Sequence, residues 1–269
     1  MKYFKPVILL MFLLICGAYV SAQTADEIIG KYIQTMGGVE QLSKINSVYT
    51  ESKFEVMGME GIGKTTLLNG KGNRQDIDIM GNTMTTCYND KGGWSLNPMT
   101  GSTTAEVMPD AQYKSGKDGI FVAGPFLDFS QRGYKAEVLG NETVDSINAV
   151  KIKVTSPDTI STVYLFDTVT GHLIKALQQM EVQGQMTDIE VKYSDFRQTD
   201  GFTMPYKMEM FIPTMQFSMT NTVTKVELNN PVDEAIFAKP TGWRRRKSRR
   251  SREILICLLM VFFSKRTQF

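Results

Sequence analysis

The spacing of hydrophobic positions changes once along the chain. Over residues 25–36 apolar side chains recur every three or four positions, with Tyr32 among the isoleucines, which predicts a helix that ends at Gly37-Gly38. A shorter helix is expected over 39–45. Beyond residue 47 apolar and polar positions alternate, which predicts strands. The clearest alternating runs are 48–56, 77–79, 150–154, 174–182, 189–193, 204–210, 215–219 and 226–228.

Turns rich in glycine, asparagine and aspartate separate these runs. Roughly ten strands at short spacing favour one antiparallel sheet with an apolar face and a wet face, and a sheet of that size must curl or close. The N-terminal helix is the expected cover for the concave face. Residues 109–133 break the pattern with prolines and glycines, and we expect a helix and loop inserted between the two halves of the sheet. We therefore predict a mainly β (α+β) fold with one domain over residues 23–240.

Composition agrees with a globular chain: 42% of the 269 residues are hydrophobic and 22% are charged. The formal net charge of the chain is +2. The first 22 residues carry a charge of +2 and those from 242 onward carry +8, so the body between them carries −8. An acidic body argues against nucleic-acid binding.

Cysteine and histidine narrow the chemistry. Cys87 is the only cysteine of the body and His172 the only histidine of the chain. A disulfide within the body, a histidine metal site and a Ser-His-Asp triad are therefore not expected. We predict no cofactor, no metal and no enzymatic activity; a hydrolase on a β scaffold is the weakest alternative, because no nucleophile-elbow or metal motif is present.

The N-terminus has the pattern of a secretory signal peptide. Lys2 and Lys5 precede an apolar run over residues 7–15, and small residues at 20 and 22 predict cleavage after Ala22. The rival interpretation is lipidation at Cys16, against which the bulky Ile15 argues. Export to the periplasm is the expectation.

Residues 58–65, Gly-Met-Glu-Gly-Ile-Gly-Lys-Thr, match the phosphate-loop pattern. That motif needs a helix after the loop, whose N-terminal N–H groups hold the phosphates. The residues that follow here are β-branched and soon stopped by Gly70. A β-hairpin is the preferred interpretation.

Methionine is frequent, with 14 of the 17 methionines in the body. Two explanations stay open: an ordinary core, or an adaptable lining for lipid chains, since methionine is flexible and polarizable.

The composition changes abruptly after residue 240. Residues 244–252 hold six arginines and Lys247, and ten apolar residues follow at 254–263, too few to span a bilayer as a helix. We expect a tail outside the fold, such as an out-of-frame end; a membrane-surface anchor is the alternative.

Several motifs follow one another in a familiar order. They are the N-terminal helix, a turn with Trp94 and Asn97-Pro98, residues 193–196 (Tyr-Ser-Asp-Phe), residues 200–205 (Asp-Gly-Phe-Thr-Met-Pro) and residues 232–237 (Val-Asp-Glu-Ala-Ile-Phe). In this order the body resembles the outer-membrane lipoprotein-sorting proteins, the LolA/LolB-like carriers. The resemblance covers nearly all of 23–240 and none of the tail.

The resemblance implies an unclosed β-barrel whose apolar hollow takes the acyl chains of a lipoprotein beneath a helical lid. Arg74 falls where those carriers have an arginine that holds the lid closed. Two departures are visible: the insert at 109–133 does not match the carriers' lid, and the body is longer than a minimal carrier. The residues that we expect to line the hollow are those at inward positions, Phe54, Val56, Ile77, Ile79, Met180, Met208, Met210 and Phe217, together with Trp94 and Phe126 near the insert.

Two functions stay open. The first is a periplasmic binder of lipids or lipoproteins, a monomer whose partners are acyl chains and envelope transport proteins. The alternative is an envelope sensor or protein-interaction module on the same half-barrel.

Overall fold

The computed structural model describes residues 23–182 and 185–240 of the chain. The expected cleavage site after Ala22 and the basic and apolar tail at 241–269 lie outside the described residues. Within the described part, no helix is both long enough and apolar enough to cross a membrane.

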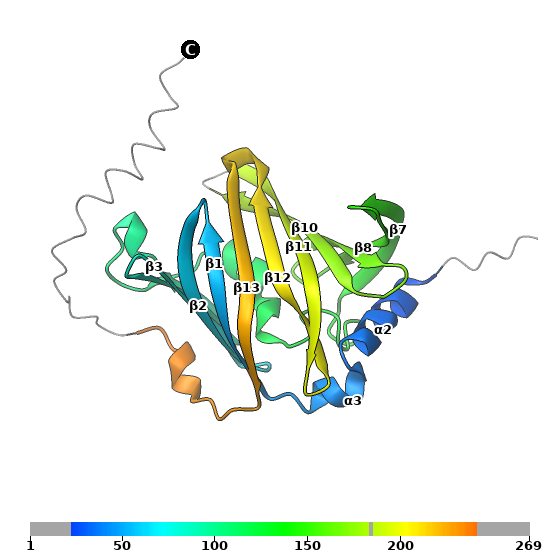
Figure 1. The fold of residues 1–269 in the computed structure, drawn as a ribbon, viewed down its shortest axis with the longest axis horizontal. Coiled ribbons are helices and arrows are strands. Elements are labelled where there is room, and N and C mark those ends of the chain that lie inside the picture. Colours follow the sequence, from blue (N-terminus) through cyan, green and yellow to red (C-terminus); the bar gives the residue numbers. More distant parts are fainter. Residues whose placement is uncertain (1–22, 183–184, 241–269) are drawn as a thin grey trace, which may run out of the picture.

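A single 13-stranded antiparallel sheet forms the body of the molecule (Figure 1). Its strands in chain order are β1 (Ser47–Val56), β2 (Met59–Leu68), β3 (Gly72–Ile79), β4 (Asn82–Asn89), β5 (Gly92–Leu96), β6 (Glu106–Val107), β7 (Lys135–Val144), β8 (Ile147–Thr155), β9 (Ser161–Asp167), β10 (Leu173–Val182), β11 (Gln185–Thr199), β12 (Phe202–Ile212) and β13 (Phe217–Leu228).

The strand order is β6-β5-β4-β3-β2-β1-β13-β12-β11-β10-β9-β8-β7. Each half of the chain builds its strands as consecutive hairpins, and the halves meet where β1 pairs with β13. The edge strands β6 and β7 are joined by residues 108–134, which we call the insert. The chain must therefore pass from one edge of the open, curved sheet to the other, which confirms the predicted half-barrel with an inserted segment.

The helices are short and lie on this frame. They are α2 (Ala25–Thr35), α3 (Gly38–Ser43), α4 (Asp110–Gly116) and the 3₁₀ turns η1 (Pro98–Thr100), η2 (Lys117–Ile120), η3 (Pro213–Met215) and η4 (Glu234–Phe237). A capping box starts α2: the hydroxyl of Thr24 accepts from the N–H of Glu27, whose carboxylate accepts from the N–H of Thr24. Figure 1 shows α2 and α3 at one end of the sheet and the segment with η4, in orange, at the other.

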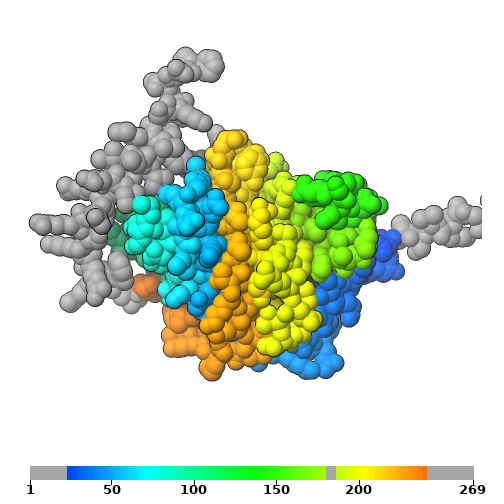
Figure 2. Space-filling model, viewed as in Figure 1, coloured from blue at the N-terminus to red at the C-terminus, as the bar shows by residue number. Residues whose placement is uncertain are grey.

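The main core lies between one face of the sheet and the helices; we call this face the inner face. Ile28, Ile29 and Ile33 of α2 pack there with Phe126 of the insert and with residues of β8 and β9, such as Ile152. The insert is drawn behind the sheet in Figure 1. Figure 2, seen from the same direction, shows the strands side by side on the near surface, with α2 and α3 at the lower right.

Candidate functional site

A cavity of about 290 Å³ lies between α2, the insert and strands β8 to β12. This is close to the lower end of the range for small-molecule sites, about 300–1,000 Å³. Its walls are mainly apolar and aromatic. The lining includes Tyr32, Val122, Phe126, Tyr134, Tyr164, His172, Tyr193 and Phe196.

An aromatic cluster forms the wall beneath α2. The ring centroid of Phe126 lies 5.1 Å from that of Tyr32, 4.8 Å from that of Tyr164 and 5.5 Å from that of Phe166, each in an edge-to-face arrangement. Because these rings come from α2, the insert and β9, the cluster holds the helix and the insert against the sheet.

Three tyrosines, Tyr32, Tyr164 and Tyr193, line this cavity. Burial raises the pKa of Tyr32, Tyr164 and Tyr193, the last to about 12, and the phenol of Tyr193 raises the pKa of the other two further. All three therefore stay protonated at neutral pH. Among the described residues neither the Tyr32 nor the Tyr193 hydroxyl has a hydrogen-bond partner, and neither is enclosed, so both are free to bond water or a molecule in the cavity.

The imidazole of His172 stacks on Phe196 at the cavity wall, with ring centroids 4.0 Å apart and an interplanar angle of 3°. Burial lowers the pKa of His172, and the carboxylate of Asp167 partly opposes that change. At neutral pH the imidazole is therefore uncharged and adds a weakly polar aromatic surface to the wall rather than a cation.

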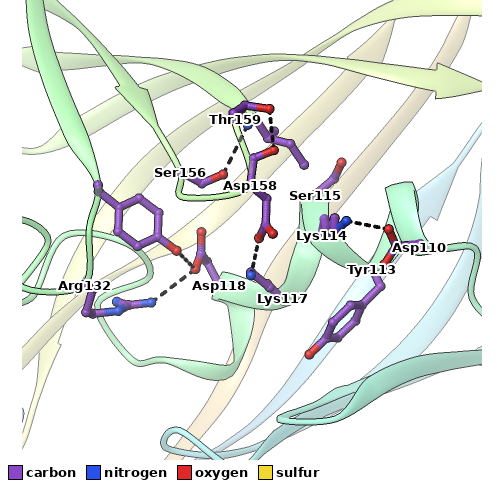
Figure 3. Close-up of polar contacts among 12 residues, drawn as sticks. Asp110, Tyr113, Lys114, Ser115, Lys117, Asp118, Arg132, Ser156, Asp158 and Thr159 are labelled. Carbon is purple, nitrogen blue, oxygen red and sulfur yellow. Dashed lines mark hydrogen bonds and ion pairs between the residues drawn. The ribbon is translucent and has the colours of Figure 1, made fainter.

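The insert bridges the two sides of the sheet. On one side Asn73 of β3 donates to the carbonyl oxygen of Gly119 (2.8 Å), and the Tyr113 hydroxyl donates to the carbonyl oxygen of Asn89 (2.9 Å). On the other side Lys117 forms an ion pair with Asp158 in the turn between β8 and β9 (Figure 3). The insert thus closes the cavity from the open side of the half-barrel.

A second polar group fixes the insert to itself. Asp118 pairs with Arg132 at 3.2 Å (Figure 3). Asp118 also accepts a hydrogen bond from the Tyr134 hydroxyl, and Arg132 donates to the carbonyl oxygen of Gly124 at 2.8 Å. Lys114, the cation on the cavity wall, pairs with Asp110 at 2.6 Å. The charges at this mouth of the cavity are therefore neutralised in pairs.

Most of the predicted lining residues share the inner face. One row runs across the sheet through directly paired positions of β3, β2, β1, β13, β12 and β11: Ile79, Gly61, Phe54, Asn221, Met208 and Tyr193. Val56 and Met210 flank Met219 in the next row, and Phe217 and Ile77 have the same orientation by alternation. Tyr193 connects this row to the cavity, where Phe126 also lies. The side chain of Met180 lies outside the described residues. Lipid contact by these residues stays a prediction.

Trp94 and Arg74 lie on the opposite, outer face. Trp94 is paired with Cys87, and Cys87 with Arg74, so these three side chains share one face. In β3, Gln75 and Ile77 face inward, so Arg74 faces the other way. Trp94 packs with Cys87 beneath Val232, Ile236 and Phe237. We call residues 232–237 the C-terminal segment. The expectation that Trp94 lines the hollow is therefore wrong: alternation within a strand does not give its face relative to distant strands.

Arg74 contacts the C-terminal segment rather than a helix over the inner face. Its guanidinium pairs with Asp76 at 2.9 Å, donates to the carbonyl oxygen of Ile236 at 3.3 Å and lies 5.7 Å from the Trp94 ring centroid. The lid role expected for Arg74 does not fit this position. The ion pair that joins the insert to the far side of the sheet is Lys117–Asp158.

The phosphate-loop pattern is part of the β1–β2 hairpin. Gly61 and Gly63 lie in β2, and a methyl group at Gly63 would lie 2.1 Å from the ring of Phe54. Gly63 therefore makes room for an inner-face aromatic side chain, and neither glycine lies in a loop before a helix. This confirms the preferred hairpin interpretation.

Sequence reasoning missed the polar part of the inner face. Thr50, Thr65, Gln75 and Thr86 are directly paired across β1 to β4 and form a polar row. Nearby, the Oδ1 atom of Asn221 is a buried side-chain oxygen without a hydrogen-bond partner in the described residues. The inward positions of Tyr164 and Tyr193 in their strands were the available signal for the tyrosine group.

In the described ranges, no three histidine, cysteine, aspartate or glutamate side chains are grouped as metal ligands would be. Cys87 is buried on the outer face, and burial raises the pKa of its thiol to about 12. Cys87 therefore does not contribute to the cavity.

Solved structures share this architecture. A DUF1329 family protein from Desulfovibrio piger superposes with a TM-score of 0.55 at 13% identity, over 81% of this chain and 98% of that one. A protein domain from Vibrio parahaemolyticus that is named for outer membrane lipoprotein sorting superposes with a TM-score of 0.52 at 12% identity, over 79% of this chain and 95% of that one. A LolA superfamily protein from Nitrosomonas europaea gives 0.52 at 16%, over 81% and 99%.

No family model matches the sequence, and no curated protein matches it. At these identities the likeness shows the fold: this chain has the LolA-like fold of an open antiparallel sheet with helices against its inner face.

Proposed function

We propose that this protein is an exported, periplasmic binder that shields an acyl chain of a lipid or lipoprotein in the cavity beneath α2 and the insert. The observation that carries the proposal is the cavity itself, about 290 Å³ in volume and walled by the aromatic cluster around Phe126. The protein binds and releases its ligand without changing it chemically.

The energetics favour such a ligand. Each methylene group removed from water contributes about 0.8 kcal/mol, so eight methylenes gain about 6 kcal/mol before the costs of ordering. A cavity of this size takes one acyl segment at a time. A longer chain continues along the inner face from Tyr193 to Met208 and Met210, which are half-buried.

The shared fold supports the proposal. The Vibrio structure is named for lipoprotein sorting, and its alignment with this chain covers 79% of this chain and 95% of that one. The methionines of the inner face offer flexible apolar contacts, which suit acyl chains of different length and unsaturation.

The test is uptake of a fluorescent fatty-acyl probe by the full chain and by two tryptophan variants. Val122 lines the cavity, so Val122→Trp fills it and is expected to lower probe affinity at least tenfold. Ile62 is 64% exposed, and Ile62→Trp is the matched control that adds the same side chain away from the cavity. Circular dichroism verifies that both variants fold. Equal uptake by all three proteins would show that the cavity is not the acyl site.

A further inference from the structure

The charges around the cavity limit what its ligand can carry. Lys114, the cation on the wall, is paired with Asp110, and Asp118 is paired with Arg132. His172 is held uncharged by burial. Among the described residues of the wall, no cation is free to neutralise a carboxylate or phosphate, and burying an unpaired charge is strongly unfavourable.

The same wall offers hydrogen-bond donors. Tyr32 and Tyr193 have hydroxyls without partners in the described chain, whereas the hydroxyl of Tyr164 is bonded to Thr162. Tyr134 also lines the cavity, but its hydroxyl already donates to Asp118. Neither the Tyr32 nor the Tyr193 hydroxyl is enclosed, so in the empty cavity both can bond water, and a ligand that displaces this water must supply an oxygen acceptor in its place.

We infer that Tyr32 and Tyr193 donate hydrogen bonds to an uncharged carbonyl oxygen of the bound molecule, so that the cavity selects an acyl ester or amide over a free fatty acid. This inference rests on the proposed acyl-binding function and names the polar group that the site recognises. A phenol is a suitable donor because it stays protonated across the neutral range and carries no charge that would lose its hydration when an apolar chain covers it.

A site built to bond a polar group discriminates more strongly than an apolar pocket, since its donors stay unpaired with the wrong ligand. Esters and ionised acids of equal chain length differ here in a further way. The ester oxygen enters without a charge, while the carboxylate must leave water with no free cation to meet it.

The test is calorimetric titration of the full chain with three short probes: methyl octanoate, octanoate at pH 7.5, and nonane. We expect methyl octanoate to bind at least tenfold more tightly than octanoate. The double variant Tyr32→Phe/Tyr193→Phe is expected to weaken methyl octanoate binding about tenfold and to leave nonane binding unchanged, since only the ester loses a hydrogen bond. Tyr49→Phe is the control: it removes a hydroxyl of β1 that bonds Glu51 away from the cavity, and it leaves the ester affinity within about twofold.

The outcomes separate the two claims. Octanoate binding as tightly as the ester, or an equal effect of the double variant on ester and nonane, would overturn the inference and leave acyl binding intact. Failure of all three probes to bind would overturn the proposed function, and the inference with it.

Discussion

Nε1 of Trp94 donates a 2.9 Å hydrogen bond to the carbonyl oxygen of Phe237, across 143 residues of sequence. The same oxygen accepts from Asn89 at 3.1 Å, and the ring of Phe237 lies over Gly72, where a methyl group would come within 2.5 Å of it. The C-terminal segment is therefore locked on the outer face of β3 to β5, opposite the cavity.

This contact predicts a stability effect without a binding effect. Phe237 is 3% exposed, so Phe237→Ala should lower the free energy of unfolding by about 3 kcal/mol. Phe211, which is 40% exposed, is the control, and its replacement by alanine should cost no more than about 0.5 kcal/mol. Urea denaturation measures both values. A loss of acyl affinity in folded Phe237→Ala would show that the outer face contributes to the site.

The Lys117–Asp158 ion pair is expected to hold the insert against the sheet. Both side chains are partly buried, 30% and 24% exposed, so Asp158→Asn should cost about 1 kcal/mol locally. Amide hydrogen exchange in residues 110–120 should become about fivefold faster. Asp195→Asn breaks the more exposed pair with Arg197 and is the matched control. Unchanged exchange in 110–120 would mean that other contacts hold the insert.

The buried amide of Asn221 predicts a stabilising substitution. Its Oδ1 atom has no partner in the described residues, and its neighbours in the row are Phe54 and Met208. Asn221→Leu should raise the free energy of unfolding by about 1 kcal/mol, since an unsatisfied polar group is replaced by an apolar one of similar size.

Asn69 provides the contrast. Its side chain donates to the carbonyl oxygen of Ile45 and accepts from the N–H of Val122, both at 3.2 Å. Asn69→Leu should therefore lower the melting temperature in thermal denaturation, whereas Asn221→Leu should raise it. A destabilised Asn221→Leu would reveal that the Asn221 amide is satisfied in solution.

His172 predicts a pH dependence of stability. Because burial lowers its pKa in the folded protein, the unfolded chain binds the proton more readily. The contribution of His172 is fully present above the unfolded pKa of about 6.5 and is lost as the pH falls from there toward the lower folded pKa. His172→Phe keeps the stack on Phe196 and removes the titration. Compared with the wild type, it should lose less stability between pH 7.5 and 5; identical losses would exclude His172 as a contributor.

Much of the architecture follows from local patterns. The helix expected at 25–36 is α2 (Ala25–Thr35), and the insert expected at 109–133 contains α4 (Asp110–Gly116). The alternation in β1 and β3 correctly groups Phe54 with Ile79. These features depend on spacing of two or about four residues, which the sequence displays directly.

The remaining features depend on long-range register. Trp94 and Ile77 lie on opposite faces because of how β3, β4 and β5 are aligned, and alternation within one strand carries no such information. The convergence of Tyr32, Tyr164 and Tyr193 similarly requires the position of α2 over β9 and β11. Each tyrosine by itself resembles an ordinary core residue of its own element.

The most direct test of acyl binding in the cavity is native mass spectrometry of the full chain, produced with its leader in a bacterium that has a periplasm and purified without detergent. We expect a bound species with the mass of one acylated molecule, which Val122→Trp reduces and Ile62→Trp retains. A ligand-free mass for all three proteins, with no uptake of added fatty-acyl probe, would contradict it and show that the helices alone fill the half-barrel.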